Sequence, residues 1–543
     1  MTSSLKVLVH SRALWPRPKG TVQLEPLRAF GLEPNVTCGP AFHAFPPLGL
    51  ILVSKPVDQA TRLLALSDLR KCLDVANEIG VLEIIEGADP HLEMGALYEL
   101  SLQKPVPPVL LFRKIKGCPD NHRVVCNVRS SKVLNDGVGL ELVQNYRKHK
   151  RKQSEPIPSE YVSDGPVLEN VLMDNEVDIL AFPAPKWHAG DGGQYIGTEC
   201  MVIAQDPDDG WVNAGTYRVS VRDKRTLSIF IEPGKHVDLI RKKWWARGQH
   251  CPMVVSVGQA PALGAAAAAT VPKGVSEFDV AGGRIGRPIK LVKGRVTGVP
   301  FPNDAELVYE GFMPSHEELT MIEGPFGEWP GYYTSSGPEP VLQVKAIYHR
   351  NDPIQCATPP ARPIYPGTYF GTAGSALIRA ASLWDDLEAA GVPGIKGVWK
   401  MPGGGSRFIN VIAIDQQHAG HAKMAGLVAA GCGSSTYLGR IIIIVDDDID
   451  ITNPAEVMWA VATRWDPKTA TDIIDGVWTG LIDPMLLPER RAQHDLTNSR
   501  IIIYAVRPFA WKDEFPKVNA VDPAYAAEVA RKWAGKLKFL DDL

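Results

Sequence analysis

Apolar residues recur at helical spacing from Ser67 onward, after a start that has no clear period. The first part of the chain holds proline-rich pieces and short apolar runs, and we expect residues 1–66 to form an N-terminal extension. Beyond it, the pattern predicts a helix that Ser67 caps and Gly80 ends, because apolar residues lie three and four positions apart. The apolar face of this helix comprises Leu69, Cys72, Leu73 and Ala76.

Short apolar runs and helical patterns alternate in the segment that follows. We expect strands at 81–85 and 109–112 and a helix at 92–102. This alternation predicts an N-terminal α/β lobe over residues 67–165. A polar, basic stretch that contains prolines, residues 148–159, predicts a linker or a mobile loop.

Many short strand patterns, separated by turn residues, fill residues 166–365. Strands are expected at 200–203, 216–221, 227–231, 253–257 and 306–309. Frequent turns between short strands are typical of a β-barrel or sandwich more than of a parallel sheet. An amphipathic helix at 236–246 is expected to cover one end of this region.

Strand and helix patterns alternate again over residues 366–520, which predicts a second α/β domain. Its expected elements are helices at 373–391 and in part of 417–436, with strands at 408–414 and 440–445. Asn453 and Pro454 supply a cap and a first-turn proline for a further helix. Residues 521–543 are expected to form a C-terminal helix that begins at Asp522 and Pro523.

Bulk composition disfavours several classes of partner. Apolar residues make up 45% and charged residues 22% of the 543 residues, and the net charge is −3. Such a chain is typical of a soluble globular protein, with no reason to expect nucleic acid or an anionic membrane as a partner. The aliphatic run at 441–445 is far shorter than the roughly 20 residues of a membrane span. Eight scattered cysteines, without a C-x-x-C pair or a secretory leader, predict free thiols and a cytoplasmic location.

Two carboxylates flank a short turn in Glu323-Gly-Pro-Phe-Gly-Glu328. Pro325 fixes one φ angle, and Gly324 and Gly327 permit conformations that other residues resist, so the turn can hold both acids in a set relation. An acid/base pair can be built in this way. Most acidic turns are simply solvated, and the hexapeptide alone leaves both interpretations open.

Three polar residues at separate points of the β-rich region suit a divalent metal. Asn213, His236 and Glu277 offer an amide oxygen, an imidazole and a carboxylate, ligands that fit an ion such as Mn²⁺ bridging a phosphate. Their spacing matches no metal motif. A satisfied asparagine, a histidine at a helix start and a surface glutamate are the ordinary alternative.

Other polar residues have two interpretations each. Arg218 can orient a carboxylate or phosphate, or form a structural ion pair. Lys423 can bind a phosphate, or be an exposed helical lysine. The turn at 190–193 can present amides to an anion, and the aspartates of 446–450 resemble a metal site or a turn at a strand end. The chain lacks G-x-G-x-x-G, P-loop and G-x-S-x-G motifs, which disfavours nicotinamide enzymes, NTPases and serine hydrolases.

Several motifs in order resemble those of the UbiD-type decarboxylases, which use prenylated FMN. The resemblance extends from about Ser67 to about Pro484. Its motifs are Asp191-Gly-Gly-Gln-Tyr-Ile196, Asn213-x-x-x-x-Arg218, Lys235-His236, Glu277-Phe-x-x-Ala-Gly-Gly283, Glu323-Gly-Pro-Phe-Gly-Glu328 with Gly331-Tyr-Tyr333, and Asp447-Asp-Ile-Asp450 leading to Trp459-Ala-x-x-Thr-Arg464.

The resemblance implies a mixed α/β fold with a central split β-barrel that binds the flavin and a C-terminal α/β domain for oligomerisation. It implies that Asn213, His236 and Glu277 bind Mn²⁺ or a similar metal, which anchors the phosphate of prenylated FMN, with K⁺ nearby. The cofactor-binding residues that it implies are Asn213, Thr216, Tyr217, Arg218, Lys235, His236, Glu277 and Lys423.

The implied reaction is reversible, non-oxidative decarboxylation through a covalent prenylated-FMN adduct. Loss of CO₂ from an sp² carbon requires an electron sink that side chains do not supply. Arg218 would hold the substrate carboxylate and pair with Glu323, and Glu328 would deliver the proton. Burial beside another carboxylate would raise the pKa of Glu328 usefully.

The expected substrate is an aromatic, heteroaromatic or α,β-unsaturated acid, or an aryl-CoA ester. Gly480 and Ile482 are expected at the substrate pocket, where Gly480 would leave room for a larger aromatic acid, and Arg362 could bind a second anionic group. A flavin-dependent oxidoreductase and a non-catalytic subunit of a carboxylase complex are the alternatives. A flavin prenyltransferase would supply the cofactor, and we expect a homodimer or homohexamer.

Overall fold

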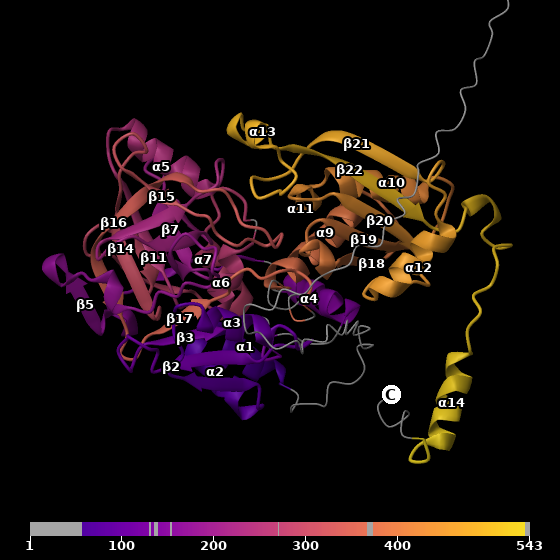
Figure 1. Ribbon diagram of the computed structural model, residues 1–543, viewed down its shortest axis with the longest axis horizontal. Helices are drawn as coiled ribbons and strands as arrows, with labels where there is room; N and C mark the ends of the chain where they lie inside the picture. The colour runs from indigo at the N-terminus through magenta and orange to yellow at the C-terminus, as the bar shows by residue number, and fades with distance from the viewer. Residues whose placement is uncertain are drawn as a thin grey trace, which may run out of the picture. The chain divides into compact units, whose positions relative to one another are not determined.

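The structure is a computed structural model that describes residues 57–129, 132–134, 139–152, 155–269, 271–365, 367 and 373–537 (Figure 1). Of the predicted extension, residues 1–66, the part up to residue 56 therefore lies outside the described residues. The chain divides into two units, which we consider separately. Val53–Ala520 form one unit, and the other includes α14 (Pro523–Trp533), which Asp522 caps as expected.

A four-stranded sheet forms the N-terminal lobe. Its order is β1 (Leu82–Glu86), β2 (Val109–Arg113), β3 (Arg123–Cys126) and β17 (Ile354–Ala357). Its helices are α1 (Gln59–Ser67), α2 (Leu69–Glu78) and α3 (Glu93–Ser101). The predicted helix is present as α2, but the cap is Asp68, which accepts from the backbone N–H of Lys71. Ser67 instead ends α1, a helix that the absence of a clear period concealed.

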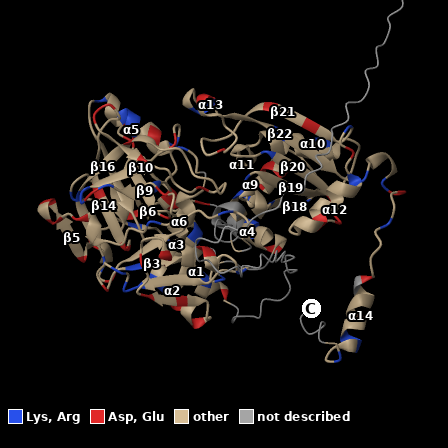
Figure 2. Cartoon of the chain, in the orientation of Figure 1, with Lys and Arg blue, Asp and Glu red and all other residues tan. Residues whose placement is uncertain are grey.

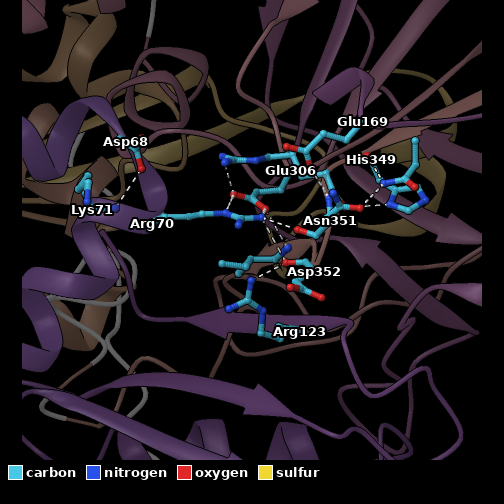
Figure 3. A network of polar contacts seen from close by, with 12 residues as sticks. Asp68, Arg70, Lys71, Arg123, Glu169, Glu306, His349, Asn351 and Asp352 are labelled. Atoms are coloured by element: carbon cyan, nitrogen blue, oxygen red, sulfur yellow. Dashed lines mark hydrogen bonds and ion pairs between the residues drawn. The ribbon is translucent and has the colours of Figure 1, made fainter. Parts of the chain in front are cut away.

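A buried ion-pair network attaches this lobe to the neighbouring sheet (Figure 3). Arg70 of α2 donates from Nε and Nη2 to the two oxygens of Glu306, both at 2.8 Å. Glu306 is 1% exposed, and it also accepts from Nη1 of Arg350 at 3.3 Å and from the backbone N–H of Ile354 at 3.2 Å. This carboxylate therefore joins a helix, a loop and β17.

A curled, half-barrel sheet of ten antiparallel strands forms the centre of the large unit. The main path is β6 (Gln194–Gly197), β9 (Arg218–Val221), β10 (Thr226–Phe230), β16 (Gly337–His349), β14 (Leu307–Met313), β11 (Cys251–Ser256), β7 (Met201–Gln205) and β8 (Val212–Gly215). Two further strands, β5 (Asn170–Met173) and β15 (Thr320–Glu323), pair with β16.

Alternating residues of these strands enter two different cores. In β11, Met253 and Val255 belong to one hydrophobic cluster and Val254 to the other. Successive side chains of a strand point to opposite faces of the sheet, so a strand that is apolar at consecutive positions packs into a core on each face. The helices of this region are α5 (His236–Ala246), α6 (Pro261–Ala267) and α7 (Glu277–Ile285). A small sheet adds β4 (Glu160–Tyr161), β12 (Lys290–Lys293) and β13 (Pro300–Pro302), with short 3₁₀ helices at Pro166–Leu168, Asp174–Glu176 and Ile179–Ala181.

The C-terminal domain is built on a mixed five-stranded sheet. Its order is β18 (Ile395–Lys400), β19 (Ile409–Ile414), β20 (Ile441–Asp446), β22 (Thr497–Ala505) and β21 (Thr471–Trp478). Its helices are α9 (Ala373–Ala389), α10 (His421–Gly431), α11 (Gly433–Thr436), α12 (Pro454–Arg464) and α13 (Pro488–Ala492), with 3₁₀ helices at Pro402–Gly404 and Phe509–Trp511. Asn453 caps α12 through the N–H of Ala455, as predicted.

Two elements differ from the domain boundaries that the sequence suggests. The basic stretch predicted as a linker is helical as far as Lys152, because α4 (Leu140–Lys152) has an apolar face. Leu142 and Val143 enter the core of the C-terminal sheet, and Arg147 pairs with Asp385 of α9 at 2.9 Å. Conversely, β17 returns to the N-terminal sheet. Both pairings are long-range, and local patterns do not reveal them.

Charges of both signs are interspersed along the described elements, as Figure 2 shows. This distribution agrees with the small net charge of −3. Among the helices that the structure describes, none combines the length and the apolar character needed to cross a membrane.

Candidate active site

Arg218 lies between the two glutamates of the acidic turn. It is the first residue of β9, and Glu323 is the last residue of β15. Arg218 donates from Nε to Oε1 of Glu323 at 2.9 Å and from Nη2 to Oε2 at 2.5 Å. Its Nη1 lies 3.1 Å from Oε1 of Glu328. One guanidinium therefore binds Glu323 through two bonds and Glu328 through one.

Aromatic side chains enclose this trio. The Arg218 guanidinium carbon lies 4.1 Å from the ring centroid of Phe230 and 5.5 Å from that of Phe326. The hydroxyl of Tyr195 donates to Glu323 at 3.0 Å. Glu323 is 1% exposed, so its ion pair with Arg218 is shielded from water.

Burial raises the pKa of Glu328, and the attraction of Arg218 offsets this only in part. The same cause raises the pKa of nearby Glu339, on β16, to about 7. Glu323 has the stronger contact with the arginine. The site therefore binds Glu323 to the arginine through two bonds and leaves Glu328 with one bond and a raised pKa, the asymmetry that an acid catalyst needs.

The Asp191-Gly-Gly motif packs against the acidic turn. Gly324 has a φ of 80°, a conformation that suits glycine, whereas Gly327 has no positive φ. The N–H of Gly192 donates to the carbonyl of Pro325 at 2.7 Å, and a Cβ on Gly192 would lie 2.0 Å from the carbonyl oxygen of Gly324. Asp191 accepts from the N–H of Gly327 at 3.2 Å. The motif thus supports the turn rather than an anion.

His188 connects this support to the N-terminal lobe. Its Nε2 lies 3.1 Å from Oε1 of Glu99 on α3, and its backbone N–H donates to Asp191 at 2.8 Å. Burial opposes the imidazolium, but the bonds to Asp191 and Glu99 outweigh burial and raise the pKa of His188 to about 9. A charged histidine therefore lies between two carboxylates.

Asn213 and Glu277 meet in a buried polar site. Asn213, on β8, donates from Nδ2 to Oε1 of Glu277 at 2.8 Å, and the N–H of Ala214 donates to Oε2 at 2.8 Å. Glu277 begins α7 and is 4% exposed, so it is not the surface glutamate of the ordinary alternative. Burial raises its pKa to about 7. His236 begins α5, a helix that also packs on β8.

The donor set fits a divalent cation. Oδ1 of Asn213 is buried and has no hydrogen-bond partner, and a buried unpaired amide oxygen is costly. A cation would use that oxygen and would favour the charged form of Glu277. The described residues contain no cluster of three or more His, Cys, Asp or Glu side chains at metal-binding distance. The predicted set has two such residues and an amide.

The other cofactor positions lie around this site, with one exception. The N–H of Thr216 donates to the carbonyl of Ala267 at 3.3 Å, and Lys235 precedes α5. The ring of Tyr217 packs on Gly215. Lys423, however, is on the solvent side of α10 and bonds to Asp472 at 3.1 Å. The structure does not bring Lys423 to the other residues, and the exposed helical lysine is the interpretation that fits.

The predicted pocket residues occupy different surroundings. A Cβ on Gly480 would lie 2.4 Å from a ring carbon of Tyr437, so the space beside Gly480 is filled by that ring and not open to a larger acid. Ile482 is half-buried. Arg362 is exposed and lies beside Gly331, in the loop that follows Glu328.

Comparison with known proteins gives the family. Residues 160–363 match the 3-octaprenyl-4-hydroxybenzoate carboxy-lyase Rift-related domain, and residues 374–505 match the C-terminal domain of the same carboxy-lyase. The pyrrole-2-carboxylic acid decarboxylase of Pseudomonas aeruginosa is 30% identical over 435 residues, which cover 74% of this chain and 83% of that protein. This chain belongs to the UbiD family.

Other UbiD relatives are similar over most of their length. The phenolic acid decarboxylase of Bacillus subtilis is 28% identical and covers 78% of this chain and 89% of its own. The UbiD-class enzyme HmfF from Pelotomaculum thermopropionicum, solved with FMN, is 30% identical with a TM-score of 0.73, covering 88% of this chain and 100% of that one. An evolved dimeric form of HmfF was solved with prFMN and has a TM-score of 0.70. The resemblance to a family of carboxy-lyases and the mixed α/β fold are thus confirmed.

Several residues near the Arg218 site are not singled out by the sequence patterns. Tyr195 stood inside a recognised motif and Phe326 inside the acidic turn, but neither had a role. His188 precedes the Asp191 motif by three residues, and this proximity is the signal that could have drawn attention to it. Phe230 and Tyr437 carry no local signal, because only the folded chain brings them to the site.

Proposed function

We propose that this protein is a prenylated-FMN-dependent carboxy-lyase that removes CO₂ reversibly from an aromatic, heteroaromatic or α,β-unsaturated carboxylic acid. The observation that carries the proposal is the buried trio in which Arg218 joins Glu323 and Glu328. The names of the relatives support it, since the Pseudomonas and Bacillus proteins are aromatic acid decarboxylases.

Arg218 positions the substrate carboxylate in this proposal. Two of its nitrogens are held by Glu323, so the guanidinium cannot rotate, while Nη1 has a single bond to Glu328. A substrate carboxylate that approaches Nη1 would compete with Glu328 for this nitrogen. The carboxyl group of Glu328 would then be freed from Arg218. Phe230 and Phe326 exclude water from the guanidinium, which strengthens its attraction for an anion.

Glu328 is the proton donor. Its raised pKa leaves a larger fraction protonated near neutral pH than an exposed glutamate would have. Once CO₂ has left, the proton goes from the carboxyl oxygen of Glu328 to the substrate carbon that carried the CO₂, and the glutamate becomes a carboxylate facing Arg218. Reprotonation of Glu328 from solvent completes a turnover.

The residues around Asn213 would hold the cofactor. Asn213, His236 and Glu277 would bind Mn²⁺ or a similar metal against the cofactor phosphate, and K⁺ would lie beside Glu277. Thr216, Tyr217 and Lys235 would complete the binding surface. When bound, prenylated FMN supplies the electron sink that decarboxylation of an sp² carbon requires. A flavin prenyltransferase as its source, a cytoplasmic location and a homodimer or homohexamer belong to the same proposal.

A screen of acids tests this function. The protein is produced together with a flavin prenyltransferase, and a panel of aryl, heteroaryl and acrylic acids is assayed for CO₂ release and for exchange of labelled bicarbonate. We expect at least one acid to turn over, and only with prenylated FMN. Equal activity with plain FMN, or a redox reaction without CO₂ release, would favour the flavin oxidoreductase. Inactivity of the loaded protein alone but activity after a partner is added would favour the subunit of a carboxylase complex.

A further inference from the structure

Three basic side chains surround Tyr437, which lies at the start of the loop between α11 and β20. The guanidinium carbons of Arg407 and Arg379 lie 5.3 Å and 5.8 Å from the centroid of the tyrosine ring. Nζ of Lys235 lies 5.5 Å from the same centroid. We call Arg379, Arg407 and Tyr437 the arginine cluster. It joins helix α9, the segment before β19 and the segment after α11.

The two arginines of the cluster lack an acidic partner among the described residues. Within the described part of the chain, no carboxylate lies within 4.0 Å of Arg379 or Arg407, whereas Arg147 and Arg218 each pair with two. Nη1 of Arg407 is buried and lacks any hydrogen-bond partner. Glu328 and Glu232 act on Arg407 only from beyond ion-pair distance. The two partly buried guanidiniums therefore repel each other at one ring, and an anion that joined them would offset this cost.

The pKa values of the basic groups are lowered, in agreement with this excess of positive charge. Burial, followed by repulsion from Arg407, lowers the pKa of Arg379 to about 9. Burial also lowers the pKa of Arg407. Lys400 of β18, which is 2% exposed, has a pKa of about 7 because of burial and then of Arg379. Each of these groups would be stabilised by a negative charge placed among them.

The arginine cluster lies beside the proposed proton donor. A Cβ on Gly405, two residues before Arg407, would lie 3.0 Å from the carbonyl oxygen of Trp329, which directly follows Glu328. Glu328 also contributes to the field at Arg407 and at Tyr437. The arginine cluster therefore lies beside the glutamate that contacts Arg218.

The cluster borders a cavity through Arg379, whereas Arg407, Tyr437 and Arg218 are not among the residues that line it. This cavity of about 890 Å³ is lined by Arg379 and Ser434 together with Val275 and Ala269, which precede the Glu277 helix. Most of the other lining residues are apolar. A largely apolar cavity with a few convergent cations suits an aromatic ligand that carries an anionic group.

We propose that the arginine cluster is a subsite for a second acidic group of the substrate, so that the enzyme prefers a dianionic aromatic acid. The inference rests on the proposed function, because Arg218 is taken to hold the reacting carboxylate. Arg379 and Arg407 then hold the distal group, a carboxylate or a phosphate, through charge-assisted hydrogen bonds. The cofactor phosphate is the other source of such an anion. The trio of Asn213, His236 and Glu277 already serves that phosphate in the proposed function.

Binding calorimetry on the cofactor-loaded protein tests the subsite with terephthalate and benzoate, which differ only in the second carboxylate. We expect terephthalate to bind about tenfold more tightly than benzoate. Arg379→Gln and Arg407→Gln should reduce this preference to about twofold or less and leave benzoate affinity unchanged. Arg407→Lys should retain part of it. Lys396→Gln, which removes an exposed charge from the same strand as Lys400, is the matched control and should keep the full preference.

Two results would overturn the subsite. One is equal affinity of the wild type for the two acids. The other is loss of prenylated FMN from the arginine variants with the terephthalate preference intact, which would assign the cluster to the cofactor phosphate. Because binding is measured without turnover, the result is separate from the proposed function. A protein that prefers terephthalate but releases CO₂ from no acid would contradict the function and not the subsite.

Discussion

At the scale of single residues, the two glutamates of the acidic turn differ in their relation to Arg218. Glu323 takes two of its nitrogens and the Tyr195 hydroxyl, whereas Glu328 takes one nitrogen and is raised in pKa by burial. The same chemical group is therefore bound through two bonds in one place and able to carry a proton in the other. The proposed metal site likewise rests on one atom, the unpaired Oδ1 of Asn213.

Replacing Asn213 tests the metal site. Asn213→Ala should lower Mn²⁺ affinity by about tenfold or more, because a ligand oxygen is lost, and should lower the prenylated-FMN content of the purified protein in parallel. Metal analysis by mass spectrometry and flavin absorbance measure both quantities.

Asn498→Ala is the matched control for that variant. Oδ1 of Asn498 is also buried and unpaired, but its Nδ2 bonds to Gly439 and Asp483 in the C-terminal domain. Metal and flavin contents should not change in this variant. An equal loss in both variants would mean that the amide matters for folding and not for the metal.

At the scale of elements, the acidic turn is positioned by a chain of contacts that begins on another helix. Glu99 of α3 contacts Nε2 of His188 at 3.1 Å, and Nδ1 of His188 lies 3.6 Å from Oδ2 of Asp191. The backbone N–H of His188 also donates to Asp191, which accepts from the N–H of Gly327 beside Glu328. A charged His188 makes this chain electrostatic, so the stability of the site depends on pH.

His188→Gln tests that chain. The pKa of His188 is raised from 6.5 to about 9 on folding, so its contribution is fully present below about pH 6.5 and is lost as the pH rises through 9. We expect the variant to be less stable by about 1–3 kcal/mol at pH 6 and nearly as stable as the wild type above pH 9.5. Urea unfolding at several pH values measures the difference. A difference that is constant from pH 6 to pH 10 would exclude a charged His188.

The elements also show where local sequence patterns suffice. Strongly periodic helices such as α5 and α12 were predicted, since the apolar spacing of α5 and the Asn453 cap of α12 are local signals. The cap of α2 is Asp68, one residue after the predicted Ser67. The sequence does not distinguish the two, because serine and aspartate cap helices equally well. The helical run of α4 was missed because its last residues are almost all basic, and its apolar face is explained only by the distant α9.

The candidate site was predictable to the extent that motifs carry it. Arg218, Glu323 and Glu328 were expected together on the strength of the family resemblance, and Asn213 with Glu277 likewise. Lys423 was expected near the phosphate from a short glycine–lysine spacing, and the fold places it on a solvent face. The arginine cluster around Tyr437 could not be predicted, because its members come from three elements and none lies in a motif.

At the scale of the whole large unit, one carboxylate joins the N-terminal lobe to the half-barrel sheet. Glu306 receives Arg70, Arg350 and the N–H of Ile354, and it is almost fully buried. Figure 3 shows how Arg70 and Glu306 converge with Asn351 and Asp352. Breaking such a buried pair leaves charges without a partner, whereas an exposed pair has little effect.

Glu306→Gln should therefore lower the free energy of unfolding by about 3 kcal/mol. The reason is that Arg70 and Arg350 lose their shared counter-charge. Glu86→Gln, which removes an exposed partner of Lys114 on β1, should leave stability nearly unchanged. Chemical unfolding of the two variants gives the comparison. Equal stability of both would mean that the buried network does not secure the lobe.

The proposed reaction depends most on Glu328, which gives the proton that replaces CO₂. The most direct measurement is the rate of CO₂ release by Glu328→Gln loaded with prenylated FMN, with the best acid from the screen and the wild type alongside. The amide cannot donate a proton in this way, so the rate should fall by about 10²–10⁴-fold while the cofactor spectrum is unchanged. A variant that retains its cofactor and releases CO₂ at the wild-type rate would contradict the account.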